Sequence, residues 1–418
     1  MTFQQKNNYA KYVLSNISYK IGTLFCIGAI IQAFMIKIGL TEEQVYFYNT
    51  LMQGIQVVVM FVMLFISDRI KKVKAVAAMT SLSFVMFLLM LIIGALLPSI
   101  NNVYTILFFA ISSVCYVGYG IHNILSYVLP YNVLDMEDYG EVTGGIGGIG
   151  GIFTFLISIL HSFIISRFDY SSSMIIFLLV AIIGLFAAAL GCLSMQEMPS
   201  KTNDAPKKDF VKVLRNKSTY ILLIPNFIRG ITTGIVGVIT VIAISRGIIT
   251  TQSSAFLNVV TQLAILVGSL LFAFTCKKFK VRKLLFISTL FVVLLLPLTV
   301  IKKDAILFLV LYGIMYLFMI IIDTSIPVLI TEIIPEDEIG GYTSIRMMVF
   351  TAGTSVATLL ITPITNLVGY VGLLIFASIC LLICCLTYYF VATIYKKGSN
   401  RNTKEKNIKE NIVQVKNG

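Results

Sequence analysis

Residues 195–217 read MQEMPSKTNDAPKKDFVKVLRNK, a polar stretch in the middle of a chain of 418 residues that is otherwise strongly apolar. Its Pro, Asn, Asp and Lys residues are typical of a solvated linker. The whole chain is 58% hydrophobic and only 12% charged, whereas soluble domains carry about 25% charged residues. Because so little polar surface is available to cover a water-soluble core, lipid must be the solvent for most of the chain.

Six long apolar runs lie on each side of this linker. A helix needs about 20 apolar residues to cross the hydrocarbon core of a bilayer, and each run is close to that length. The predicted spans are 14–36, 44–66, 75–97, 103–130, 145–166, 172–194, 218–243, 254–275, 284–301, 305–331, 342–365 and 369–395. We therefore predict an all-α membrane protein with twelve transmembrane helices in two pseudo-symmetric six-helix halves. The predicted parts are an N-terminal half over 1–194, a cytoplasmic linker over 195–217, a C-terminal half over 218–395 and a basic cytoplasmic tail over 396–418.

The basic residues indicate which side of the membrane each loop occupies. Of the 32 Lys and Arg residues, 24 lie on the side that holds the termini, 5 lie on the opposite side, and 3 lie within or at the edges of spans. Because cytoplasmic loops carry an excess of Lys and Arg, we predict a multi-pass protein of the cytoplasmic (cell) membrane with both termini in the cytoplasm. The basic residues behind the net charge of +13 then lie beside the membrane, so we expect no nucleic-acid partner.

The two halves resemble each other at corresponding loops. Lys72-Val73-Lys74 follows the second span, and Lys280-Val281-Arg282 follows the eighth span 208 positions later. Acidic stretches, each between a proline and a pair of glycines, follow the fourth and the tenth spans in the same way. Both pairs of corresponding loops are separated by about the same number of positions, which favours tandem six-helix halves.

Six plus six spans, a long central loop and the basic loop Asp68-Arg69-Ile70-Lys71-Lys72-Val73-Lys74 resemble the major facilitator superfamily. Within that superfamily, three patches resemble the glycoside–pentoside–hexuronide:cation symporters, the melibiose-carrier family. The patches are Tyr19-Lys20-Ile21-Gly22, Pro130-Tyr131 and Asp138-Tyr139-Gly140-Glu141-Val142-Thr143-Gly144. The resemblance implies a secondary active transporter that moves a small polar solute by alternating access, through ion-coupled symport. The solute would be a sugar, a sugar acid or an organic anion.

Two departures from that family affect the expected coupling ion and solute. Gln56 and Met60 stand where the family carries acidic residues for its cation, so we expect protons rather than sodium as the coupling ion. The chain has no Trp, whereas sugar sites commonly stack a sugar face on an indole. A proton-coupled multidrug or metabolite exporter of the same superfamily is therefore the alternative, and a polytopic membrane enzyme or receptor is a more distant one.

Ionised side chains in the middle of a bilayer cost about 2.5–3.5 kcal/mol each on insertion scales, so they favour a functional explanation. Asp323 is the single carboxylate inside a predicted span, while Arg229 lies in span seven and Lys20 in span one. Polar residues also recur at helical spacing on spans four, seven and ten. The resemblance implies that these helices, with span one, line a central cavity. The predicted substrate-binding residues are Lys20, Tyr116, Tyr119, Asn123, Tyr127, Asn226, Arg229, Tyr316 and Asp323.

Arg229 and Asp323 are predicted to meet. Counted from the cytoplasmic ends of their spans, they lie about 12 and about 9 residues deep, a difference of roughly 4 Å at 1.5 Å per residue. We expect them to pair or to share a solute, and a buried ion pair with a purely structural role is the alternative. Lys20 would then add a surplus positive charge, which favours an anionic or strongly hydrogen-bonding solute unless Lys20 reaches water at the rim.

Charged loops on the side of the termini predict a gate. Loops after spans two and eight are basic, loops after spans four and ten are acidic, and the resemblance implies that basic and acidic loops face each other across the seam between the halves. Ordinary solvated loop charge is the alternative. The predicted gating residues are Asp68, Arg69, Asp138, Glu141, Lys280, Arg282, Glu332 and Glu338.

No motif predicts a catalytic centre, a metal site or a cofactor. The seven cysteines show no paired metal spacing, and His122 and His161 lie in different spans, which provides no ligand cluster for zinc. We therefore expect a monomeric transporter rather than an enzyme, with a small-molecule solute, a coupling ion and the lipid bilayer as its partners.

Overall fold

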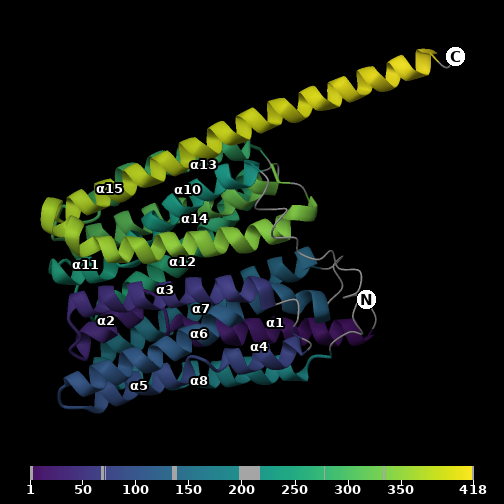
Figure 1. Ribbon diagram of the computed structural model, residues 1–418. Helices are drawn as coiled ribbons and strands as arrows, with labels where there is room; N and C mark the ends of the chain where they lie inside the picture. The colour runs from purple at the N-terminus through teal and green to yellow at the C-terminus, as the bar shows by residue number, and fades with distance from the viewer. Residues whose placement is uncertain are drawn as a thin grey trace.

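The computed structural model describes residues 3–66, 70, 72–133, 139–196, 217–276, 278–331, 333–334 and 336–416, which are helical apart from short turns and bends. Figure 1 shows the helices in two stacked groups. The first group contains α1 (Phe3–Leu24), α2 (Ala29–Lys37), α3 (Glu42–Ile66), α4 (Val73–Ser81), α5 (Val85–Leu96), α6 (Asn102–Val133), α7 (Tyr139–Arg167) and α8 (Tyr170–Ser194). The second contains α10 (Lys217–Gly237), α11 (Ile239–Ser245), α12 (Ser254–Thr275), α13 (Val281–Leu298), α14 (Ala305–Thr331) and α15 (Glu336–Lys416).

Helices of membrane-spanning length follow one another along both groups. Within the described residues, 11 helical stretches are long and apolar enough to cross a membrane. The last of them, Tyr342–Val391, is 50 residues long. It makes two crossings, because α15 turns at Gly369, where φ is 70°. The predicted all-α fold of twelve transmembrane helices in two six-helix halves is confirmed.

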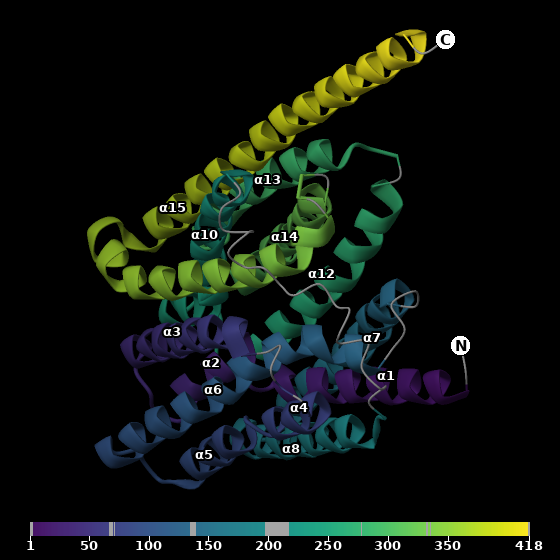
Figure 2. The same ribbon diagram turned by 45° about the vertical axis from the view of Figure 1, so that its right-hand side comes forward.

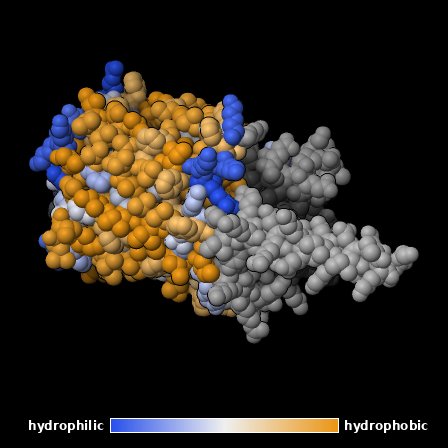
Figure 3. Space-filling model, turned by 90° about the horizontal axis from the view of Figure 1, so that it is seen from above, coloured by the Kyte–Doolittle hydropathy of each residue, from blue (hydrophilic) through white to orange (hydrophobic). Residues whose placement is uncertain are grey.

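Large apolar side chains cover the outside of the bundle. Leu367, Ile306 and Met79 are 83%, 76% and 74% exposed, and many other Leu, Ile, Val and Phe side chains are similarly open. Figure 3 shows hydrophobic residues over most of the visible face, with hydrophilic residues gathered toward the ends of the helices. Patches of this extent do not occur on soluble monomers, whereas lipid chains solvate them. The chain is therefore a membrane protein.

The first, third and seventh spans are each interrupted. The first span passes from α1 to α2 through Gly28, whose φ of 89° is a left-handed backbone conformation that favours glycine. The seventh passes from α10 to α11 at Val238, which lies 210 positions after Gly28. Corresponding spans of the two halves thus break at corresponding positions. The third span passes from α4 to α5 between Ser81 and Val85. A break inside a span matters because main-chain polar groups freed there need new partners.

The most extensive contacts between the halves are those of α3 with α15 and of α7 with α12. Helix α2 also packs on α11 and α12. Figures 1 and 2 both show α3 beside the arm of α15 that begins the helix. Along the α3/α15 seam, Thr50 Oγ1 donates to Thr358 Oγ1 at 2.9 Å. Along the α7/α12 seam, Asn258 Nδ2 donates to Ser158 Oγ at 2.6 Å. These contacts lie in the parts of the helices remote from the two termini.

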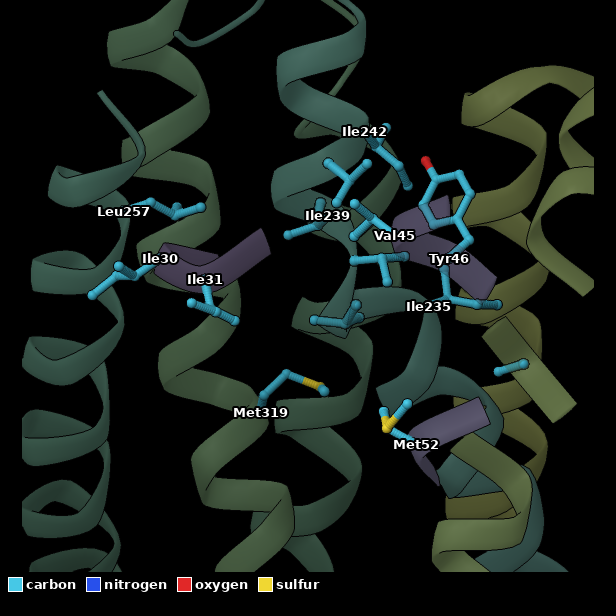
Figure 4. Packing of buried hydrophobic residues seen from close by; sticks show 14 of the residues in the cluster. Ile30, Ile31, Val45, Tyr46, Met52, Ile235, Ile239, Ile242, Leu257 and Met319 are labelled. Atoms are coloured by element: carbon cyan, nitrogen blue, oxygen red, sulfur yellow. The ribbon is translucent and has the colours of Figure 1, made fainter. Parts of the chain in front are cut away.

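A buried apolar cluster fills the same end of the bundle. Ile30 and Ile31 of α2 lie between Leu257 of α12 on one side and Ile239 and Ile242 of α11 on the other (Figure 4). Each of the five is at most 2% exposed. Helices α2 and α11 are the pieces that follow the breaks in the first and seventh spans, and they contact each other across the halves. We call this end, opposite to the termini, the closed end, and the other the terminal end.

Candidate functional site

A cavity of about 310 Å³ lies between the two halves. The N-terminal half contributes residues from the break after α1, from α3 and from α6, and the C-terminal half contributes residues from α10 and α15. The lining residues are Ile27, Gln53, Gln56, Met60, Tyr116, Tyr119, Asn123, Ile124, Ser126, Thr233, Ser344, Met347, Phe350, Thr351 and Thr354. Three predicted substrate-binding residues, Tyr116, Tyr119 and Asn123, are therefore in its wall.

The cavity ends where the seam at the closed end begins. Gln53 and Thr354 belong to its wall, and Thr354 Oγ1 donates to Gln53 Oε1 at 3.4 Å across the halves. One turn further toward the closed end, Thr50 and Thr358 are hydrogen-bonded to each other. The cavity thus lies on the terminal side of the contacts that hold the halves together.

The described lining mixes apolar side chains with amides and hydroxyls, and it carries no Lys, Arg, Asp, Glu or His side chain. Its amides are Gln53, Gln56 and Asn123, and its hydroxyls come from Tyr, Ser and Thr residues of both halves. Amides and hydroxyls both donate and accept hydrogen bonds. Aromatic surface adjoins them: the rings of Tyr116 and Tyr119 meet edge to face with centroids 5.7 Å apart, and Phe350 belongs to the lining contributed by α15. Such a wall can bind an uncharged molecule rich in hydroxyl groups.

Arg229 and Asp323 form an ion pair beside this cavity, as the depths of the two residues predict. The Nη2 atom of Arg229 on α10 lies 2.5 Å from Oδ1 of Asp323 on α14. The pair is asymmetric, because the side chain of Arg229 is 2% exposed and that of Asp323 is 49% exposed. Neither residue is in the cavity wall. The guanidinium of Arg229 is therefore buried inside the C-terminal half, whereas the carboxylate of Asp323 is about half exposed at its surface.

Thr233 connects the ion pair to the cavity. It follows Arg229 by one turn of α10, it belongs to the cavity wall, and its Oγ1 accepts a hydrogen bond from Arg229 Nη1 at 3.1 Å. The Nε atom of Arg229 is buried and has no hydrogen-bond partner among the described residues. Two of the guanidinium's nitrogen atoms thus face a carboxylate and a cavity hydroxyl.

The other predicted substrate-binding residues lie outside this cavity wall. Asn226 donates Nδ2 to the carbonyl of Leu222 and to the hydroxyl of Tyr342 at 3.1 Å, inside the C-terminal half. Lys20 lies against α7, where a methyl group added at Gly150 would come within 3.4 Å of Nζ. Tyr316 packs on Tyr312 of its own helix, with ring centroids 5.5 Å apart. The side chain of Tyr127 lies outside the described residues.

Most of the predicted gating residues cannot be placed. Asp68, Arg69, Asp138 and Glu332 lie outside the described residues, and so do the side chains of Glu141 and Glu338. Lys280, before α13, is exposed, and Arg282 in its first turn is half-buried. The charged gate at the terminal end stays a prediction.

The contribution of α15 to the cavity wall was not predicted from the sequence, because its polar side chains there are uncharged hydroxyls. Ser344, Thr351 and Thr354 belong to the cavity wall, and Thr358 follows them in the seam. Their spacings of seven, three and four residues place them on one helical face. This periodicity was the available signal, but Ser and Thr in apolar helices are common because their hydroxyls bond the preceding turn.

Comparisons with known proteins agree with this architecture. Residues 222–416 match the family model of the Major Facilitator Superfamily. A crystal structure of a D-xylose–proton symporter is similar at a TM-score of 0.69 and 12% identity, covering 92% of this chain and 97% of the symporter chain. A crystal structure of the nucleoside transporter NupG is similar at a TM-score of 0.62 and 14% identity, covering 94% of this chain and 99% of that chain. No curated protein sequence matches.

At identities of 12% and 14%, what this chain shares with the two transporters is the fold. The two solved structures span nearly the whole chain, and the family model matches most of its second half. Together with the two six-helix halves and the cavity between them, these similarities show that the chain has the fold of the major facilitator superfamily.

Proposed function

We propose that the protein is a secondary active transporter that moves a small polar solute across the cytoplasmic membrane by alternating access. The observation that carries the proposal is a cavity between two six-helix halves whose wall offers amides and hydroxyls. Apolar packing and hydrogen bonds across the halves close it at one end. Rocking of the halves about such a site would expose it to either side in turn. With the termini in the cytoplasm, as the basic loops predict, the closed end faces outward.

The lining favours a neutral sugar or a related polyhydroxy compound over a sugar acid or an organic anion. An anion would need a cationic partner to offset its desolvation, and the described wall offers amides and hydroxyls instead. Lys20 is not in that wall, so the surplus positive charge expected from the sequence gives little support to an anionic solute. The two structural neighbours, a xylose–proton symporter and a nucleoside transporter, and the resemblance to the melibiose-carrier family are compatible with this choice.

Asp323 is the proposed site of the coupling proton. Its carboxylate is 49% exposed and is neutralised by Arg229, so a proton arriving at the carboxylate would release the guanidinium. Exposure to lipid would be costly for a carboxylate. We therefore infer that the exposed part of the Asp323 side chain contacts water. Sodium coupling has less support, since Gln56 and Met60, which replace the symporter family's acidic residues, line the cavity without a charge.

Export of a drug-like compound is the second candidate. Ile27, Met60, Met347 and Phe350 give the cavity an apolar share, and flexible methionines adapt to varied ligands. The two candidates differ in the ligand that each predicts. Sugars would use the amides, whereas lipophilic cations and antibiotics would use the methionines and Phe350.

A thermal-shift screen of the purified protein tests the proposal. Neutral sugars, nucleosides, sugar acids, organic anions and antibiotics are compared at two pH values, with and without sodium. We expect stabilisation by a neutral polyhydroxy compound, stronger at the lower pH and indifferent to sodium, because a ligand stabilises the state that it binds. Stabilisation by antibiotics alone would favour the exporter, and stabilisation by organic anions alone would contradict the proposed solute class.

A further inference from the structure

We propose that Thr233 is the residue that couples solute binding in the cavity to protonation of Asp323. The inference rests on the proposed function and deepens it, since it assigns the contact through which the solute site and the proton site affect each other. Thr233 is a positioning residue toward the proton site and a contact residue toward the solute.

One hydroxyl of the described cavity wall is hydrogen-bonded to the guanidinium. The other described titratable groups that face the ion pair are Tyr316 on α14 and Cys384 and Cys385 on α15. Thr233 is in the cavity wall, whereas Arg229 and Asp323 are not. Its Oγ1 accepts from Arg229 Nη1 at 3.1 Å, and Arg229 Nη2 lies 2.5 Å from Asp323 Oδ1. The chain of contacts therefore runs from the cavity to Thr233, then to the guanidinium, and then to the carboxylate. Because Arg229 is 2% exposed, direct access of a solute to the guanidinium is blocked.

The chemistry of a hydroxyl suits this position. A threonine hydroxyl carries one proton to donate and two lone pairs to accept with. In the described part of the chain, the hydrogen bond recorded at Thr233 is the one that it accepts from Arg229. Its own proton is then available to an oxygen of the solute. A hydroxyl that accepts from a cation becomes a stronger donor, because hydrogen bonds in a chain polarise one another.

Protonation of Asp323 strengthens this donor. With the carboxylate ionised, Arg229 divides its charge between Asp323 and Thr233. When the carboxyl takes up a proton, the ion pair is lost and the guanidinium acts on Thr233 alone, so that the solute binds more tightly. Binding equilibria are reciprocal, and the bound solute must therefore favour the protonated carboxyl by the same factor. Positive coupling of this sign is what symport requires.

The neighbouring residue provides a matched control. Thr232 is fully buried, and its hydroxyl donates to the carbonyl of Ala377 at 3.2 Å, away from the cavity. Replacing either threonine by valine removes one hydroxyl and leaves the size of the side chain nearly unchanged. The two changes lie at adjacent positions of α10. Thr351 is a second control, because it belongs to the cavity wall and bonds the carbonyl of Met347 on its own helix. Thr351→Val therefore alters the wall without touching Arg229.

The test measures how solute affinity depends on pH. The full chain in lipid nanodiscs is titrated calorimetrically with D-xylose, D-galactose and uridine. For the tightest probe we expect wild-type Kd to be about fivefold or more lower at the acidic end of the titration than at its alkaline end, the lower end of typical coupling. In Thr233→Val the ratio should fall below about twofold. It should be retained in Thr233→Ser, Thr232→Val and Thr351→Val.

Three outcomes would overturn the inference. If Thr233→Val keeps the wild-type ratio, the coupling runs elsewhere, while the proposed function stands. If Thr233→Val abolishes binding of every probe while Thr232→Val binds normally, Thr233 is a solute contact without a coupling role. If the wild-type protein binds no probe at either pH, the proposed solute class fails, and the inference fails with it. Unfolding of Thr233→Val would be recognised by its melting curve, and Thr233→Ser against Thr233→Ala would then replace it as the test pair.

Discussion

Gln32 of α2 donates its Nε2 proton to the main-chain carbonyl of Gly237 at the end of α10, at a distance of 2.9 Å and across 205 positions of the chain. This bond joins the piece after the break in the first span to the break in the seventh. Gln32 is 4% exposed, and its Oε1 is buried with no hydrogen-bond partner among the described residues. A single amide thus bridges the two discontinuous helices at the closed end.

Replacing Gln32 by leucine should loosen the closed end. The change leaves the Gly237 carbonyl unsatisfied in a buried setting, which costs about 1–3 kcal/mol. We expect faster hydrogen–deuterium exchange over α2 and α11 in Gln32→Leu than in the wild type. Gln44→Leu is the control, because Gln44 bonds Thr41 within its own half. Equal exchange in Gln32→Leu and Gln44→Leu would show that the bridge does not hold the closed end.

The pair of Arg229 and Asp323 should serve transport beyond its structural role. Asp323→Asn leaves a buried cation without a carboxylate, at a cost of roughly 1–3 kcal/mol, since the open carboxylate is partly screened. Arg229→Met combined with Asp323→Leu removes both charges and should recover most of that stability. Transport driven by a proton gradient should stay absent in the double variant. Uptake at the wild-type rate by that variant would leave the pair with a structural role only.

Asn123 should contribute directly to solute affinity. It lies in the cavity wall and offers both a donor and an acceptor, so Asn123→Leu should raise Kd for a neutral sugar by about tenfold, the equivalent of 1.4 kcal/mol. Ser288→Ala is the control, because Ser288 is buried in α13 outside the lining. An unchanged Kd in Asn123→Leu, measured by calorimetry, would move the solute site away from α6.

Close packing of α10 on α15 predicts a strong effect of a single methyl group. A side chain at Gly353 would run into the carbonyl oxygen of Phe227 and lies 3.1 Å from Cα of Gly230. Overpacking of this kind costs about 1–3 kcal/mol. Gly353→Ala should therefore lower the melting temperature. Gly151→Ala should not, because nothing lies within 4 Å of the added methyl group and alanine favours helix. Equal melting temperatures would contradict the close approach.

The number and order of the spans could be predicted because apolar length alone decides whether a helix crosses a membrane. The pairing of Arg229 with Asp323 followed from counting depth along two helices. Both inferences use properties of single helices in a solvent of known thickness. The breaks at Gly28 and Val238 could not be predicted, because they depend on partners from the other half, such as the amide of Gln32. Several other glycines in the spans stay helical.

The cavity wall was predicted unevenly for a related reason. Tyr119 and Asn123 stood out in an apolar helix, and both line the cavity. Thr351 and Thr354 did not stand out, since a hydroxyl that bonds its own helix is inexpensive in lipid. Lys20 was expected to face the cavity because a lysine inside a span is costly, yet it lies against α7 and outside the described wall.

Flux through reconstituted protein tests the central claim most directly. Purified full-length protein is placed in liposomes, and uptake of radiolabelled neutral sugars is followed with and without a proton gradient, acidic outside. We predict accumulation of a neutral sugar above its external concentration while the gradient lasts, prompt loss of it when a protonophore is added, and no accumulation by Asp323→Asn. Solute distribution that ignores the gradient, or accumulation that persists in Asp323→Asn, would contradict proton-coupled transport through this cavity.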